Sequence, residues 1–140
     1  MNTQNVTLPL PEPLFLRFQQ MATATRQPLT DLLLRAVEMG GPPSWEEAPP
    51  RFQADLVALD RLDDDALWRV ARSRPSQAAV ARFQELLERQ AEDRLKQEEQ
   101  NELKQLMQDA DLLMLRKAHA VTLLRWRGHA IPPAEKLMAS

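Results

Sequence analysis

The chain has 140 residues, no cysteine and a formal net charge of −2, with 44% hydrophobic and 5% aromatic residues. The absence of cysteine excludes disulfides and thiolate metal sites, and only three glycines disfavour an all-β fold with many tight turns. No apolar run approaches the roughly 20 residues of a membrane span, and the first residues lack the pattern of a signal peptide. We therefore expect a mainly α-helical, cytoplasmic protein that does not enter the membrane.

Residues 5–10 have the alternating pattern of one β-strand. Val6, Leu8 and Leu10 form its apolar face. A single strand cannot satisfy its backbone hydrogen bonds, and no second strand is predicted in the chain. We therefore expect this strand to pair with its copy in a second chain, with these three residues in a homodimer interface.

Two helices are predicted after the strand. Pro11-Glu12-Pro13 suits a first helical turn, and this helix should end before Pro28, because the residue preceding proline avoids the α conformation. The second helix is predicted to begin near Leu29-Thr30-Asp31. It should end at Gly40-Gly41-Pro42-Pro43.

A linker over residues 41–50 is predicted from its proline and glycine content, and it separates residues 1–40 from a helical region over 51–131. That region should begin with short helices at 51–59 and 66–72. Asp63-Asp64-Asp65 suits the N-cap and acidic first turn of the second of these helices. The spacing and glycine of a calcium loop are missing, which favours capping over metal binding.

From Gln77 the pattern is helical almost to Gly128, with a loose tail expected over 132–140. One apolar stripe contains Val80, Phe83, Leu86 and Leu87. A second contains Leu103, Leu106, Met107, Ala110, Leu113, Met114, Val121 and Leu124. The charged stretch 92–100 between the stripes predicts the turn of an antiparallel helical hairpin. A single longer helix is the alternative.

No pattern of catalytic residues is found, so we expect no enzyme activity, no metal and no cofactor. His119 and His129 lie ten residues apart and do not form a metal-binding pair on one helical turn. Phosphate-binding glycine loops, nucleophile elbows and zinc-protease motifs are missing from the sequence. The many carboxylates lie beside arginine and lysine at helical spacing, as on solvated helix faces.

Charge is unevenly distributed along the second half of the chain. Acids outnumber bases nine to four over residues 85–111, whereas residues 112–140 hold five bases and one acid. This asymmetry indicates either matching to a helix dipole or a basic surface for an acidic partner. In the second interpretation, the residues that bind a partner protein are Arg116, Lys117, Arg125, Trp126 and Arg127. Trp126 packed against Trp45 is the structural alternative.

Residues 5–18 and 30–37 together resemble the ribbon-helix-helix family, in which an alternating strand runs into Pro-Glu and two short helices. The resemblance implies a swapped dimer in which two strands form a β ribbon. In family members that bind double-stranded DNA, outward strand residues read bases and the second helix begins at a phosphate. Carried onto this chain, the DNA-binding positions are Thr3, Asn5, Thr7 and Thr30. Residues 1–40 have zero net charge, so a ribbon kept only for dimerisation remains open.

The second half resembles a group of uncharacterised bacterial proteins that are regarded as antitoxin-like. The similar segments are 83–90, 102–107, 115–118 and 125–128. The resemblances imply an antitoxin-like protein or small transcriptional regulator, whose C-terminal helices bind a toxin-like or other protein. A helical adaptor or scaffold that does not bind DNA is the alternative.

Overall fold

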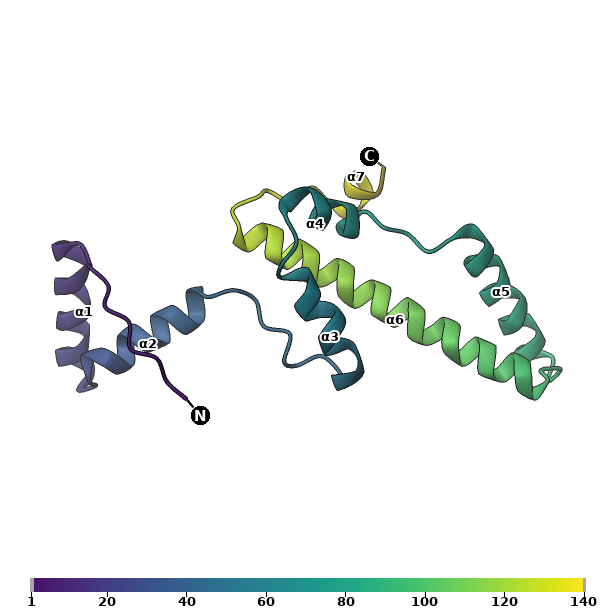
Figure 1. Ribbon diagram of the computed structural model, residues 1–140, viewed down its shortest axis with the longest axis horizontal. Coiled ribbons are helices and arrows are strands. Elements are labelled where there is room, and N and C mark those ends of the chain that lie inside the picture. The colour runs from purple at the N-terminus through teal and green to yellow at the C-terminus, as the bar shows by residue number, and fades with distance from the viewer. Residues whose placement is uncertain (1, 140) are drawn as a thin grey trace. The chain divides into compact units, whose positions relative to one another are not determined.

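The computed structural model describes residues 2–139, which form seven α-helices and no β-strand (Figure 1). The predicted mainly α class is therefore confirmed. The helices are α1 (Glu12–Thr25), α2 (Leu29–Gly40), α3 (Pro50–Leu59), α4 (Asp64–Ala71), α5 (Gln77–Ala91), α6 (Gln97–Trp126) and α7 (Ala134–Ala139).

The predicted strand and its ribbon-helix-helix fold are wrong. Residues 5–10 belong to no strand, and the side chains of Val6 and Leu8 are 84% and 65% exposed. An alternating pattern places apolar side chains on one face, but a strand also needs a neighbour for its ladder of hydrogen bonds. No neighbour pairs with this segment within residues 2–139, and Pro9 has no N–H to donate.

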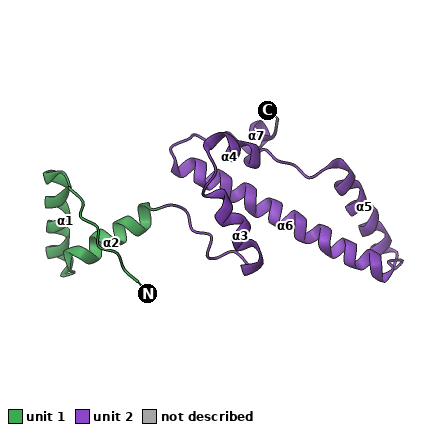
Figure 2. Ribbon diagram, in the orientation of Figure 1, with its two compact units in different colours: residues 1–41 green, residues 42–140 purple. Residues whose placement is uncertain are grey.

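The chain divides into two compact units, residues 1–41 and 42–140 (Figure 2). In unit 1, α1 and α2 contact each other. Helix α1 ends at Arg26, which adopts a left-handed conformation (φ 54°) and donates its N–H to the carbonyls of Ala22 and Thr23. Helix α2 follows directly after Pro28. Both ends agree with the prediction from Pro28.

Unit 2 is built around α6, a helix of 30 residues. Helices α3 and α4 pack on α6, and α5 makes fewer contacts with it. The core contains Leu56, Leu59, Leu67, Ala71, Ala120, Leu123, Leu124 and Leu137. It joins α3 and α4 to the C-terminal third of α6. Burial of such side chains stabilises a fold by about 1.5–3 kcal/mol each.

Local hydrogen bonds position the short helices of unit 2. The Asp63 carboxylate accepts the Ala66 N–H at 2.8 Å, which confirms the predicted cap. Within the predicted linker, Trp45 and Ala48 pack against the core of unit 2. Gln53 donates to the carbonyls of Glu46 and Ala48. Residues 42–50 of that linker are therefore part of unit 2.

The turn between α5 and α6 decides in favour of the helical hairpin over one continuous helix. It covers only residues 92–96, where 92–100 was predicted, and Asp93 adopts a left-handed conformation (φ 58°). The expected loose tail is also corrected, since it contains α7 with a buried Leu137. Proline is compatible with a first turn, and the Leu137 N–H donates to the Pro133 carbonyl at 2.9 Å.

Candidate interaction surfaces

Unit 1 exposes an extensive apolar surface. Ala22 is the only buried side chain among residues 2–41. Nine large apolar side chains of this unit are exposed, and we call them the unit 1 surface: Val6, Leu8, Leu14, Phe15, Leu16, Met21, Leu34, Val37 and Met39. Helices of 12–14 residues are marginal in water without tertiary packing. Two such helices that bury one small side chain lack the core that normally stabilises a fold.

The residues predicted to bind DNA or to form the dimer lie in the same unit. Thr3, Asn5 and Thr7 are exposed on the extended segment, and Leu10 is half-buried. Thr30 is exposed in the first turn of α2, where Asp31 adds a negative charge. This carboxylate stands where a phosphate would have to approach the helix start. The structure therefore provides no basic or pre-formed DNA site at these positions.

The residues predicted to bind a partner protein differ in their exposure, and their role in binding stays a prediction. Arg125 and Trp126 are exposed, whereas Arg116, Lys117 and Arg127 are half-buried. The Arg116 Nε is buried and has no hydrogen-bond partner among the described residues. The Lys117 ammonium lies 3.3 Å from the sulfur of Met138.

Arg127 connects the end of α6 to the segment between α3 and α4. Its guanidinium donates to the Asp64 carboxylate at 2.8 Å, to the Leu62 carbonyl at 2.9 Å and to the Asp60 carbonyl at 3.3 Å. Charge-assisted bonds of this kind are the stronger hydrogen bonds of proteins. Arg127 therefore has an evident structural task within the chain.

Two histidine–aspartate pairs reinforce this connection. The Nε2 of buried His119 lies 2.8 Å from Asp60 Oδ1, and the Nε2 of His129 lies 2.6 Å from Asp64 Oδ2. The His129 ring also meets Trp68 edge-to-face, with centroids 5.9 Å apart. Arg127, followed by His129, holds the pKa of Asp64 below its ordinary value by hydrogen bonding to its charged form. We call Asp60, Asp64, His119, Arg127 and His129 the α6 latch.

Sequence reasoning did not find the α6 latch, because its hydrogen-bonded partners lie 59–67 residues apart along the chain. The three aspartates at 63–65 were predicted to cap α4, and Asp63 does so. Asp64 instead turns to Arg127 and His129. Histidine paired with carboxylate is also common in catalytic sites. Here the pairs join α6 and the residues just after it to the segment between α3 and α4 and to the start of α4, and their contacts are those of tertiary packing.

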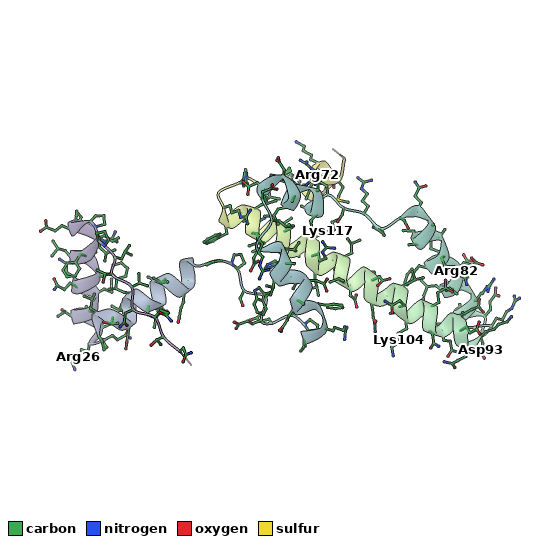
Figure 3. The ribbon with its side chains drawn as sticks, viewed as in Figure 1. Arg26, Arg72, Arg82, Asp93, Lys104 and Lys117 are labelled. Carbon is green, nitrogen blue, oxygen red and sulfur yellow. The ribbon has the colours of Figure 1, made fainter. Side chains whose placement is uncertain are left out.

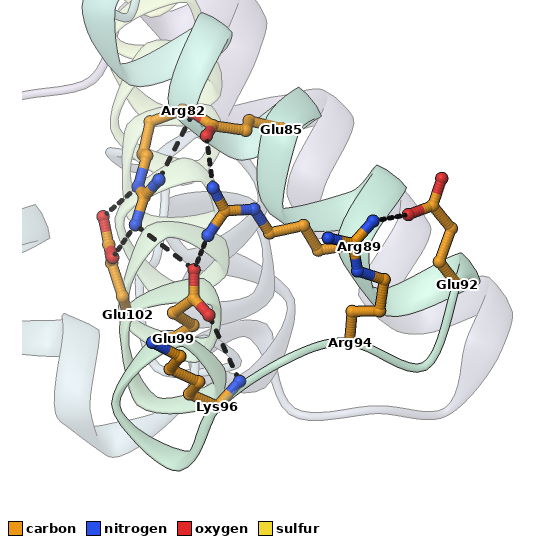
Figure 4. Close-up of polar contacts among 8 residues, drawn as sticks. All are labelled: Arg82, Glu85, Arg89, Glu92, Arg94, Lys96, Glu99 and Glu102. Carbon is orange, nitrogen blue, oxygen red and sulfur yellow. Dashed lines mark hydrogen bonds and ion pairs between the residues drawn. The ribbon is translucent and has the colours of Figure 1, made fainter.

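A second polar network closes the hairpin between α5 and α6 (Figure 4). Arg82 donates to both carboxylate oxygens of Glu102 at 2.7 and 2.9 Å, a bidentate arrangement. Arg89 bonds to Glu85 at 2.9 Å and also to Glu99. Glu99 is buried and accepts the Lys96 N–H at 3.2 Å.

The charges of this network shift one another's pKa values. The Lys96 N–H is the main cause that lowers the pKa of Glu99, and Arg89 and Arg82 add to the effect. Arg82 likewise lowers the pKa of Glu102, and Glu102 raises the pKa of Arg82. Arg82, Glu99 and Glu102 therefore remain charged at neutral pH, and the network fastens the two helices of the hairpin together.

Two shallow hollows follow each other along α6. The first, of about 240 Å³, is lined by Gln90, Leu95, Gln100, Leu103, Lys104 and Met107. The second, of about 300 Å³, is lined by Pro75, Ala110, Leu113, Met114 and Lys117. Ala110 and Leu113 were predicted to be core residues of the hairpin. The structure leaves Ala110 exposed and Leu113 half-buried.

Comparisons of the chain with protein-family models, curated proteins and solved structures found no match. The resemblances to ribbon-helix-helix and antitoxin-like proteins therefore receive no support from relatives. Among residues 2–139, no three histidine or acidic side chains are placed to hold a metal ion together. In the same part of the chain, no helix is long and apolar enough to cross a membrane.

Proposed function

We propose that this protein is a non-catalytic helical adaptor that forms a homodimer through the unit 1 surface and presents two copies of unit 2. The observation that carries the proposal is the exposure of nine large apolar side chains on a unit that buries only Ala22 among its described residues. Apolar exposure on this scale marks an interaction site in soluble proteins.

The size of the unit 1 surface suits a stable dimer. Its nine large apolar side chains are each at least 36% exposed, and interfaces of standard size bury about 800 Å² per partner. Most of this surface is apolar, as in the core of homodimer interfaces.

Charge also favours a second copy as the occupant. Residues 1–41 contain three arginines and three acids, so two copies of unit 1 approach without net repulsion. Each copy carries charges of both signs, so ion pairs can form across the rim between a base of one copy and an acid of the other. The bases are Arg17, Arg26 and Arg35, and the acids are Glu12, Asp31 and Glu38. A nucleic-acid partner would require a basic surface, which unit 1 lacks.

Contact of Thr3, Asn5 and Thr7 with DNA stays a prediction and is not part of this proposal. It required a β ribbon to present these residues to the major groove. The extended segment contributes Val6 and Leu8 to the unit 1 surface instead.

The proposal is tested by the molar mass of the full chain, measured by light scattering after size-exclusion chromatography. We expect a dimer at about 50 µM, because interfaces of standard size bind in the µM to pM range. Leu34→Asp with Val37→Asp places two charges in the unit 1 surface and should give a monomer. Circular dichroism should show that α3 to α7 remain folded in this variant.

Two substitutions serve as controls. Gln20→Asp adds a charge at an exposed polar position of α1, and Val80→Asp adds one at an exposed apolar position of α5. Both variants should remain dimeric. A wild-type chain that is monomeric at this concentration would overturn the proposal. A dimer that survives the change of Leu34 and Val37 but is lost with Val80→Asp would place the interface in unit 2.

A further inference from the structure

Helix α6 carries a seam of positions that alternate at spacings of four and three residues, the spacing of coiled-coil interfaces, and every position except Lys117 is apolar. The seam consists of Leu103, Met107, Ala110, Met114, Lys117, Val121 and Leu124. Its two ends are covered within unit 2, since Leu103 is 4% and Leu124 0% exposed. Its middle is uncovered, since Met107 is 51% and Met114 64% exposed.

The uncovered middle has the shape of a shallow trough. The two hollows described above lie along it: one ends at Met107 and the other lies between Pro75 and Met114. Ala110 has the smallest side chain of the seam and leaves room there for a larger side chain of another helix. Methionine is flexible and adapts to a neighbour's shape, which suits Met107 and Met114 to a binding surface.

The charged residues that line the two hollows of the trough are both lysines. Lys104 lines the first hollow and Lys117 the second, and they lie about 20 Å apart along α6 (Figure 3). Exposed Arg74 precedes Pro75 at the rim, and no acid occurs between Asp65 and Glu85. Two exposed acids, Asp109 and Asp111, lie on α6 between Met107 and Met114. Asp109 accepts a hydrogen bond from Gln105 at 2.9 Å.

We propose that the stretch of α6 from Lys104 to Lys117, the α6 trough, binds an amphipathic helix of another protein. The bound helix would carry apolar residues at spacings of three and four over about four turns. It would carry acidic side chains at both ends of that stripe, near Lys104 and Lys117. This inference goes beyond the proposed dimer and does not depend on it, because the trough lies wholly within unit 2.

A second copy of α6 fits the trough less well. An antiparallel pair centred on the exposed stretch would place Lys104 of one copy beside Lys117 of the other. A parallel pair would place each lysine beside its own counterpart. Like charges in these positions destabilise a helix pair, whereas an acidic partner helix converts both positions into attractive contacts.

The probe is a fluorescent synthetic helix of about 18 residues, or five turns, with leucines at the seam spacing and glutamates at both ends. A matched probe carries lysines in place of the glutamates. Anisotropy measured with the full chain should show the acidic probe binding at least about tenfold more tightly than the basic probe, equivalent to about 1.4 kcal/mol. Lys104→Glu with Lys117→Glu should reverse this preference.

The apolar contacts are tested by Met107→Asp with Met114→Asp, which should weaken binding of the acidic probe by about tenfold or more. These side chains are exposed, so the helix content should not change. If it does, Met107→Gln with Met114→Gln replaces them at similar size and should still weaken binding. Arg61→Glu with Arg69→Glu changes the net charge equally at two exposed residues of unit 2 that line neither hollow, and should leave the preference for the acidic probe intact.

Three results would overturn the proposal. In the first, the two probes bind the wild-type chain equally well. In the second, neither pair of methionine substitutions weakens binding of the acidic probe. In the third, Arg125→Glu weakens binding of the acidic probe as much as Lys104→Glu with Lys117→Glu does, which would move the site to Arg125 and Trp126. Leu34→Asp with Val37→Asp should still bind the acidic probe as a monomer, so the dimer and the trough fail or succeed separately.

Discussion

Leu124→Ala and Met114→Ala make a matched test of which part of the α6 seam is core. Both residues lie on the same helix face, ten residues apart, but Leu124 is fully buried and Met114 is mostly exposed. Leu124 packs in the cluster that joins α6 to α3 and α4. Its truncation removes buried methyl groups and leaves a cavity, which typically costs about 2–5 kcal/mol.

The expected cost is large for a unit of this size, since domains unfold with about 5–15 kcal/mol. Met114→Ala should change the free energy of unfolding by less than about 0.5 kcal/mol, as surface substitutions usually do. Alanine also favours helix, so helix propensity does not distinguish the two variants. The difference between them therefore reports tertiary burial.

The free energy of unfolding of both variants is measured by urea titration of the full chain, with the helical circular dichroism signal at 222 nm as the readout. The midpoint of the unit 2 transition should fall for Leu124→Ala, without a change in its slope, and stay near wild type for Met114→Ala. Equal losses for the two variants would mean that the seam is covered along its whole length. That result would refute the reasoning on which the α6 trough rests.

Two further outcomes follow from the polar networks. The pKa values of Asp64, Glu99 and Glu102 are lowered in the folded chain, so their ionised forms stabilise it above their ordinary values of 3.8 for the aspartate and 4.5 for the glutamates. This stability should be lost as the pH falls below 4.5 and through the pKa values of the folded chain, and the urea midpoint should fall with it. In the variant Glu99→Gln with Glu102→Gln, the urea midpoint should fall less steeply with pH. Arg127→Met should lower the thermal midpoint of unit 2 by several degrees, because it breaks three bonds of the α6 latch, whereas exposed Arg125→Met should not.

Most helix boundaries could be predicted from the sequence. Pro28 separates α1 from α2, the glycines and prolines at 40–43 end α2, and Asp63 caps α4. These signals act within one helical turn, through a missing N–H or a side-chain oxygen near the helix start. They are therefore readable without knowledge of the tertiary structure.

The β-strand at residues 5–10 could not be judged in the same way. Alternation of apolar side chains is a local property, but a strand exists only with a neighbour that supplies hydrogen bonds. Helix α7 was missed for a related reason. Its six residues all favour helix, but a helix this short is marginal in water without packing, and burial of Leu137 against the core holds it in place.

The sequence by itself determined the α class, the breaks between helices and the seam of α6, because each depends on residues a few positions apart. Only the tertiary structure decided that His119 meets Asp60, that Arg127 binds Asp64, and that the seam is covered at Leu124 but open at Met114. A periodic apolar stripe looks the same in sequence whether or not another helix covers it. Its exposure depends on where distant segments pack, and here α3, α4 and α5 leave the middle of α6 open.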